Sequence, residues 1–172
     1  MSWQPARQSL LSRIVIAGLV VGVTAIAFSL GIGSPWPEGE AREAEEMNLR
    51  EAVLRYQMRH NASSQRSGAK VYCLTIARLD PDDAFLRRFA SHEVPVRKAS
   101  DCNASERGVF DKATGAMGLE LHAGTVTWFS GNEATVQGGY YEASLSASRN
   151  VYRLKKNGNG WAVVEDRLTV IA

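Results

Sequence analysis

The sequence predicts an α+β domain, a curved antiparallel sheet wrapped on an amphipathic helix as a cone-like roll, behind one N-terminal transmembrane helix. Three observations predict it. Residues 14–33 are apolar and uncharged, residues 48–56 have apolar side chains at helical spacing, and residues 118–172 alternate between apolar and polar side chains. The chain therefore divides into a cytoplasmic tail (1–13), a transmembrane helix or signal anchor (14–33), a linker with the start of a helix (34–47) and an extracytoplasmic domain (48–172).

The uncharged stretch at residues 14–33 is long enough to cross a bilayer, whose hydrocarbon core of about 30 Å needs about 20 helical residues. Arg7 and Arg13 precede it, and the first ionisable residue after it is Glu38. The positive-inside rule then places the N-terminus in the cytoplasm and the domain outside, with a bacterial inner membrane facing the periplasm as the expected location. The alternative is a cleaved signal peptide and a secreted domain, but such peptides have a shorter apolar core and an A-x-A-like cleavage site.

Charge is balanced in the rest of the chain. The sequence holds 20 Lys+Arg and 18 Asp+Glu, and Arg7 and Arg13 account for the difference. Nucleic-acid binding needs clustered Lys and Arg that release counterions, so we expect no nucleic-acid partner. No spacing of His, Asp or Glu is typical of a metal site, and no nucleotide loop is present. We therefore expect no metal and no cofactor.

The first element of the domain is an amphipathic helix that starts near Glu40 and stops near Asn61. Its apolar stripe consists of residues at positions i, i+3, i+4 and i+7, which are Leu49, Ala52, Val53 and Tyr56. Because the helix has one apolar stripe, it must pack on another element. The sheet is the only candidate for that contact.

Two short strands and a short helix follow. Residues 70–77 are rich in β-branched and aromatic side chains, which predicts a strand. Asp80, followed by a proline, predicts the N-cap of a helix over 81–90. Residues 94–99 predict an edge strand, because Pro95 has no N–H to donate to a neighbouring strand.

The two cysteines, Cys73 and Cys102, both lie in the predicted extracytoplasmic part. A disulfide between them is chemically permitted there, and it would tie the strand at 70–77 to a polar loop that we predict at 100–115. The alternative is that Cys73 is a small buried apolar side chain within its strand. The chain has no C-x-x-C and no His beside either cysteine, so nothing indicates a catalytic pair.

The last third of the domain predicts four consecutive antiparallel strands. They run over residues 119–128, 134–145, 151–156 and 161–170. The alternation slips by one residue at Gly124, which predicts a bulge. Gly138 and Gly139 lie in mid-strand and predict a kink. The Asn-Gly-Asn-Gly sequence at 157–160 is the best hairpin turn in the chain.

These elements resemble a known family. The helix Asn48-Leu-Arg-Glu-Ala-Val-Leu-Arg-Tyr, the small helix after it and a meander that closes on Gly-Trp-Ala-Val-Val-Glu-Asp look like the nuclear-transport-factor-2-like (SnoaL-like, cystatin-like) cone. The resemblance covers residues 48–172 and implies a cone whose interior holds a ligand or an active site. In that family the helices usually precede most of the sheet, whereas here the strand at 70–77 separates the first two. A cystatin-like variant or another α+β roll therefore stays open.

Asp166 is the anomalous residue of the last strand. It is the one charged residue in a row that otherwise consists of Ala162, Val164, Leu168 and Val170. If this row faces the interior of the cone, the desolvated carboxylate could serve as a general base. If Asp166 lies at the open end, or pairs with Arg149 or Arg153, its role is structural. The candidate ligand-binding residues are Trp128, Tyr140, Glu142 and Asp166.

Two functions compete at this point. The favoured one is a single-span, membrane-anchored protein whose extracytoplasmic domain binds a partner protein or a small ligand, as part of a membrane-associated assembly or by self-association. The second is a small enzyme of the hydrolase or isomerase type that uses the cone interior, with Asp166 as its base. Few polar residues converge in the pattern, so the sequence favours the binding protein.

Overall fold

The computed structural model describes residues 37–171, which form two α-helices, one short 3₁₀ helix and eight strands. The elements are α1 (Gly39–His60), β1 (Tyr72–Ile76), α2 (Asp83–Arg87), β2 (Val96–Lys98), η1 (Ala99–Asp101), β3 (Cys102–Ser105), β4 (Gly108–Asp111), β5 (Met117–Ser130), β6 (Glu133–Ala143), β7 (Ser146–Asn157) and β8 (Gly160–Ile171). The helix predicted at 14–33 lies outside the described residues. Within 37–171, neither helix has the length and apolar composition that crossing a membrane requires.

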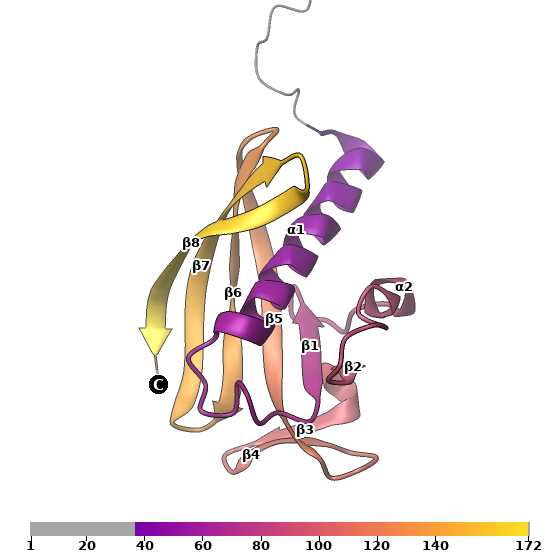
Figure 1. Ribbon diagram of the computed structural model, residues 1–172, viewed down its shortest axis with the longest axis vertical. Helices are drawn as coiled ribbons and strands as arrows, with labels where there is room; N and C mark the ends of the chain where they lie inside the picture. The colour runs from indigo at the N-terminus through magenta and orange to yellow at the C-terminus, as the bar shows by residue number, and fades with distance from the viewer. Residues whose placement is uncertain (1–36, 172) are drawn as a thin grey trace, which may run out of the picture. The chain divides into compact units, whose positions relative to one another are not determined.

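All eight strands belong to one mixed sheet (Figure 1). The strand order is β2-β1-β5-β6-β7-β8, and β4 attaches the β3–β4 hairpin to β5. Strands β5 to β8 form the predicted antiparallel meander. The prediction of an antiparallel sheet is wrong for the other edge, because β1 pairs in parallel with both β2 and β5. The chain between β1 and β5 holds α2 and three short strands, which is enough length for the crossover that a parallel pair requires.

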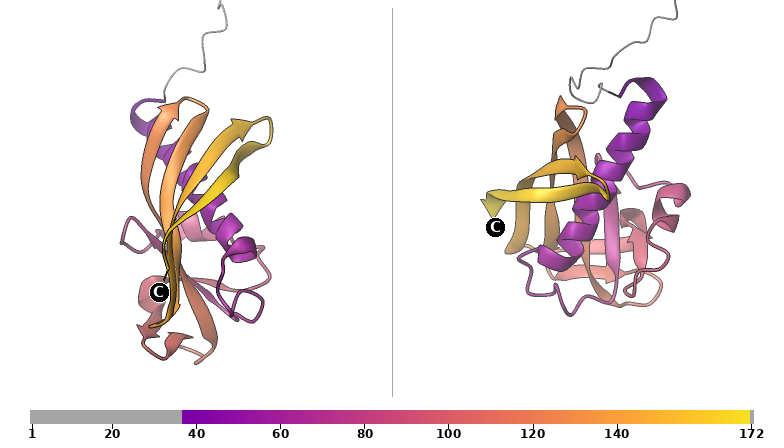
Figure 2. Two further views of the ribbon diagram at one scale, coloured as in Figure 1. Left: turned by 90° about the vertical axis from the view of Figure 1, so that its left-hand side faces the viewer. Right: turned by 45° about the horizontal axis from the view of Figure 1, so that its top comes forward.

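The helix α1 crosses one face of the sheet, which we call the inner face; the opposite face is the outer face (Figures 1 and 2). Leu49, Val53 and Leu54 are fully buried between the helix and the strands. The predicted stripe is therefore confirmed at Leu49 and Val53. Ala52 and Tyr56 are half-buried at its margin. Each buried leucine or valine stabilises the contact by about 1.5–3 kcal/mol relative to exposure.

Glycines shape the middle of the sheet, and the bulge predicted at Gly124 is confirmed. The β5–β6 register shifts around Gly124, which places a bulge there. Gly138 lies beneath α1, where a Cβ would stand 2.7 Å from the carbonyl oxygen of His122 and 2.9 Å from Nε2 of Gln57. The absence of that Cβ lets the buried Gln57 reach the strand and donate from Nε2 to the same His122 oxygen at 3.0 Å. The glycine thus permits the close approach of helix and sheet.

The last strand does not keep the alternation that its sequence predicts. Opposite β7 its register shifts twice, so that Val164 and Thr169 are extra residues on β8. The β8 residues that pair with the inward-facing residues of β7 are Trp161, Val163, Asp166, Leu168 and Ile171. The expectation that Ala162 and Val170 share a face with Asp166 is therefore wrong, because each bulge exchanges the two faces.

The loop predicted at 100–115 contains η1 and the β3–β4 hairpin instead. The two strands pair from Cys102 opposite Asp111 to Ser105 opposite Gly108. Strands of four residues are too short for an alternating pattern to be seen, which explains why the sequence suggested only a loop. The hairpin packs on the outer face of the sheet beside β1.

The short helix and the edge strand of the middle region follow the prediction with different bounds. Asp82, not Asp80, caps α2 and accepts a hydrogen bond from the backbone N of Phe85 at 2.7 Å. Asp80 accepts instead from the backbone N of Ser100 at 3.0 Å and so fastens the chain after β2. The edge position predicted for the strand with Pro95 before it is confirmed, since β2 ends the sheet.

A disulfide joins Cys73 in β1 to Cys102 in β3. Cys73 is also fully buried, so it is both a disulfide partner and a small buried side chain within its strand, the two alternatives that the sequence left open. Both cysteines belong to a small second core on the outer face, with Val71 and Val109. The bond therefore fixes the β3–β4 hairpin to the parallel part of the sheet.

Candidate functional site

A hollow of about 200 Å³ opens on the inner face where α1 ends beside β7 and β8. We call it the inner hollow. Its lining includes His60, Asn61, Ser148, Asn150, Tyr152 and Asp166. The hollow lies where α1 ends at His60 and the chain turns into the loop that follows it, beside the inward-facing side chains of the two strands (Figure 1).

Asp166 holds the one carboxylate of this lining. Its Oδ1 accepts a hydrogen bond from Nδ2 of Asn150 at 2.5 Å, and the Oδ1 of that amide accepts in turn from Oγ of Ser148 at 2.7 Å. Asn150 and Ser148 are inward-facing neighbours on β7, so the strand itself arranges this chain of donors. The chain fixes the direction of the carboxylate while Asp166 remains exposed to solvent.

Aromatic rings form the wall beside the carboxylate. The ring of Tyr56 lies 4.5 Å from that of His60 and meets Tyr152 edge-on at 5.8 Å, measured between ring centroids. Burial raises the pKa of Tyr152, and the nearby carboxylate of Asp166 raises it further. Burial and Asp166 also raise the pKa of Tyr56. Both hydroxyls therefore stay protonated, in a hollow whose field is negative.

The end of α1 adds to this negative field. The hollow includes His60 and Asn61, which end the helix, and both the backbone N and Nδ2 of Asn61 donate to the carbonyl oxygen of Gln57, at 3.1 and 2.5 Å. A helix of 22 residues carries about half a negative charge at its C-terminus. A carboxylate, a helix C-terminus and aromatic faces all favour a positively charged group.

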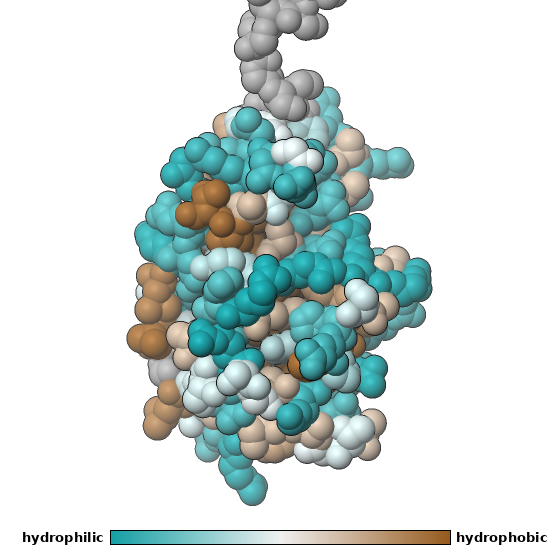
Figure 3. Space-filling view, viewed as in Figure 1, coloured by the Kyte–Doolittle hydropathy of each residue, from teal (hydrophilic) through white to brown (hydrophobic). Residues whose placement is uncertain are grey.

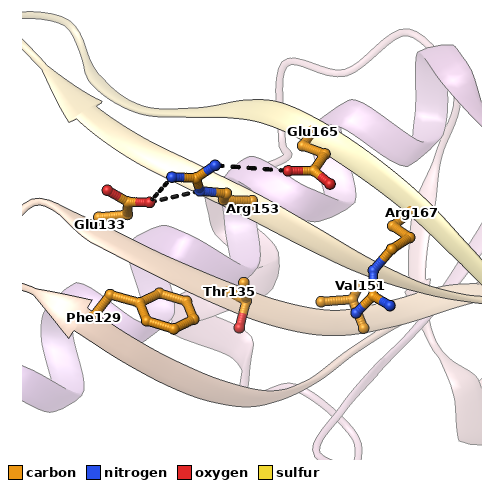
Figure 4. Close-up of a pocket in the computed structure, with 7 residues that line it drawn as sticks. All are labelled: Phe129, Glu133, Thr135, Val151, Arg153, Glu165 and Arg167. Atoms are coloured by element: carbon orange, nitrogen blue, oxygen red, sulfur yellow. Dashed lines mark hydrogen bonds and ion pairs between the residues drawn. The ribbon is translucent and has the colours of Figure 1, made fainter.

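A second, larger hollow of about 330 Å³ lies on the outer face over β5 to β8 (Figure 4). We call it the outer groove. Arg153 stands in its middle and pairs with Glu133, and with Glu165 at 3.8 Å. Phe129 borders it on one side and Arg167 on the other. Its two arginines and two glutamates balance in charge, so it has no preference for the sign of a small ion.

The predicted candidate residues do not meet in one place. Asp166 lines the inner hollow. Trp128 packs near the start of α1, where its Nε1 donates to Glu46 at 3.4 Å and its ring lies 5.5 Å from that of Trp161. Tyr140 is buried in the core.

Glu142 fastens the loop that follows α1 to the β6–β7 turn. Its carboxylate accepts hydrogen bonds from the hydroxyls of Ser63, Ser64 and Ser146, at 2.8, 2.5 and 2.6 Å. Burial raises the pKa of Glu142, but these hydrogen bonds outweigh it and lower the pKa overall. Neither Arg149 nor Arg153 pairs with Asp166 within residues 37–171; the partner is Asn150.

Sequence reasoning missed His60, Asn150 and Tyr152. Tyr152 is directly opposite Asp166 in the β7–β8 register, and Asn150 lies two residues before Tyr152 on β7. The register could have been reached from the hairpin turn at 157–160, but only if the bulge at Val164 had been known. No sequence pattern indicates His60 as a site residue, because its position depends on where α1 crosses the sheet.

Comparison with protein-family models, with curated proteins and with solved structures finds no match to this chain. The function has to be argued from the geometry of the domain itself.

Proposed function

We propose that the chain is a membrane-anchored, non-enzymatic binding protein whose extracytoplasmic domain holds a small cationic group, such as an amine, in the inner hollow. The observation that carries the proposal is the coincidence of Asp166, the C-terminus of α1 and the rings of Tyr152 and His60 around one opening. Each of the three favours a cation by a different interaction: a charge-assisted hydrogen bond, the helix dipole and cation–π attraction.

The size of the hollow limits the ligand. At about 200 Å³ the inner hollow is smaller than the pockets of about 300–1,000 Å³ that enclose drug-sized molecules. It suits the charged end of a ligand, with the remainder outside. A headgroup, a small amine or the N-terminus of a peptide shares this chemistry.

The location outside the membrane is part of the proposal. The apolar stretch at 14–33 and the arginines before it support an anchor with the domain outside. The disulfide between Cys73 and Cys102 suits an oxidising compartment, because thiols stay reduced in the cytosol. The nuclear-transport-factor-2-like resemblance is likewise a proposal. A helix across the inner face of a bent sheet supports it, and the parallel pairing of β1 is the departure.

The second candidate function is an enzyme with Asp166 as general base. Tyr152 beside it offers a hydroxyl that stays protonated and could stabilise an oxyanion. Asp166 is exposed, however, and lacks the desolvation that would make a carboxylate a stronger base. The binding function therefore has the better support.

Ligand titration of the purified full-length chain in detergent tests the binding function. We expect ethanolamine and tetramethylammonium to shift NMR signals of the inner hollow and to raise the melting temperature, while acetate does neither. Asp166→Asn should weaken the binding of ethanolamine by about tenfold, the loss of about 1.4 kcal/mol of charge-assisted hydrogen bonding, and that of tetramethylammonium by less, because it has no N–H to donate. Gln137→Ala, on the outer face of β6, is the matched control. Equal responses to acetate and the cations would refute the proposal.

A further inference from the structure

The two edges of the sheet differ in how they meet solvent. The β2 edge is three residues long, follows Pro95 and carries Arg97 and Lys98. Short length, proline and charge are the means by which proteins prevent an edge strand from pairing with another chain. The β8 edge is 12 residues long and has no proline. The β8 edge has its charges at Glu165, Asp166 and Arg167 and bulges at Val164 and Thr169, so a strand that pairs with it has to match these charges between the two bulges.

The β8 edge also carries exposed apolar side chains on either side of its charged residues. Hydrophobic surface follows the margin of the molecule at which β8 lies (Figure 3). The residues concerned are Val164, Leu168, Val170 and Ile171, with exposures of 53%, 51%, 51% and 63%. A long strand with unpaired backbone groups and exposed apolar side chains is a template for another strand.

We propose that β8 pairs antiparallel with β8 of a second copy of this chain, about a two-fold axis at Asp166. The bulges at Val164 and Thr169 confine the regular segment of β8 to residues 165–168, so the pairing must be centred there. Directly opposite residues of an antiparallel pair share a face. The axis must therefore pass through a residue, which pairs with its own copy, and not between two residues.

Charge selects Asp166 as that residue. Centring there places Glu165 opposite Arg167 of the other copy, twice. Glu165 has a long contact of 3.8 Å with Arg153, and Arg167 has no ion pair within residues 37–171. Centring on Arg167 would instead set two guanidinium groups against each other and form no Glu–Arg pair. Like charges directly opposite destabilise a strand pair, and opposite charges stabilise it.

The cost of this register is one Asp166–Asp166 contact. The hydrogen bond from Asn150 Nδ2 draws the Asp166 carboxylate toward β7, away from the edge. Two Glu–Arg pairs oppose that single repulsion. Because the β2 edge is protected and β3, which also has one neighbour, is four residues long, each copy offers one long edge, and the assembly closes as a two-fold dimer instead of continuing into a filament.

Cysteine cross-linking of the full-length chain in its membrane tests the pairing. Asp166→Cys places two thiols at the two-fold axis, where opposite Cα atoms lie about 4.5–5.5 Å apart, within reach of a disulfide. The native cysteines do not compete because they are bonded to each other. Gln137→Cys is the control for collisions in the membrane, since this exposed residue lies on β6 away from the edge. We expect a cross-linked dimer from Asp166→Cys, and an equal yield from both variants would overturn the proposal.

Charge exchange identifies the register. In the Asp166→Cys background, Glu165→Arg or Arg167→Glu alone should raise the dimer dissociation constant by about tenfold or more, because two attractive pairs become repulsive. The combined exchange should restore the yield of the Asp166→Cys variant alone. Glu165→Gln removes the charge without reversing it and should give an intermediate yield, which keeps the test valid if a reversal unfolds the domain. No loss in the single variants, or no recovery in the combined one, would overturn the register.

Discussion

The outer face of β5 holds two ionisable residues whose pKa values burial moves in opposite directions. Burial raises the pKa of Glu120, against which a hydrogen bond from Thr75 acts weakly. Burial lowers the pKa of His122, and the nearby Arg149 lowers it further. Both shifts disfavour the charged form. His122 is therefore uncharged at neutral pH on the outer face of the sheet.

The stability of the domain should fall in acid because of His122. Its folded pKa lies below the unfolded value of about 6.5, so below that pH the unfolded state binds the proton first and is favoured, by at most about 1.4 kcal/mol per pH unit. The raised pKa of Glu120 acts in the opposite direction, because protonation of Glu120 favours the folded state as the pH falls. We expect urea unfolding to show a smaller loss between pH 7.5 and 5.5 for His122→Gln than for the wild type. His60→Gln is the control, and equal losses in both variants would contradict the assignment.

The close approach at Gly138 should make that position intolerant of a side chain. Gly138→Ala places a Cβ 2.7 Å from the His122 carbonyl oxygen, so the helix or the strand must move. We expect a loss of about 2 kcal/mol in the free energy of unfolding, as overpacking in a core usually costs. Gly158→Ala is the matched control, because a Cβ there meets nothing within 4 Å. Similar melting temperatures for the two variants would show that the contact relaxes freely.

Elements differ in how far the sequence predicts them. Helix α1 and the β5–β8 meander have long periodic patterns, and both were found where expected. The β3–β4 hairpin and the parallel pairing of β1 were missed, because their strands are short and their partners are distant in sequence. Of the residues that line the inner hollow, the sequence indicated only Asp166 as a candidate. The other residues of the hollow come together through bulges on β8 and through the angle of α1, which no local pattern encodes.

The disulfide should matter most for the β3–β4 hairpin. It closes a loop across a sequence separation of 29 residues, a size at which a native bond contributes about 2–4 kcal/mol. We expect reduction to lower the unfolding midpoint of the wild type and to speed amide exchange in β3 and β4 before it affects β6 or β7. Cys102→Ser should have the lower midpoint from the start and should not respond to reductant. Uniform exchange across the sheet would mean that the hairpin is held by other contacts.

For the whole molecule, the proposed topology predicts which residues reagents can reach. Ser2→Cys and Ser67→Cys place single reactive thiols before the apolar stretch and in an exposed turn after α1. A membrane-impermeant maleimide should label Ser67→Cys in cells with a permeable outer membrane and label Ser2→Cys only after lysis. Labelling of Ser2→Cys from outside would reverse the orientation. Release of Ser67→Cys into the soluble fraction would indicate cleavage instead of an anchor.

The parallel pairing of β1 with β5 also sets the order in which the domain can form. β1 and α1 are made first, yet β1 pairs with β5, and α1 packs on the β5–β8 meander, which are made later. The meander can assemble from neighbouring segments, whereas the long-range pairing of β1 has to wait for it. Until then the apolar stripe of α1 has no partner and is a binding site for chaperones. A chain that stops before β5 should therefore be degraded, not stored as a folded fragment.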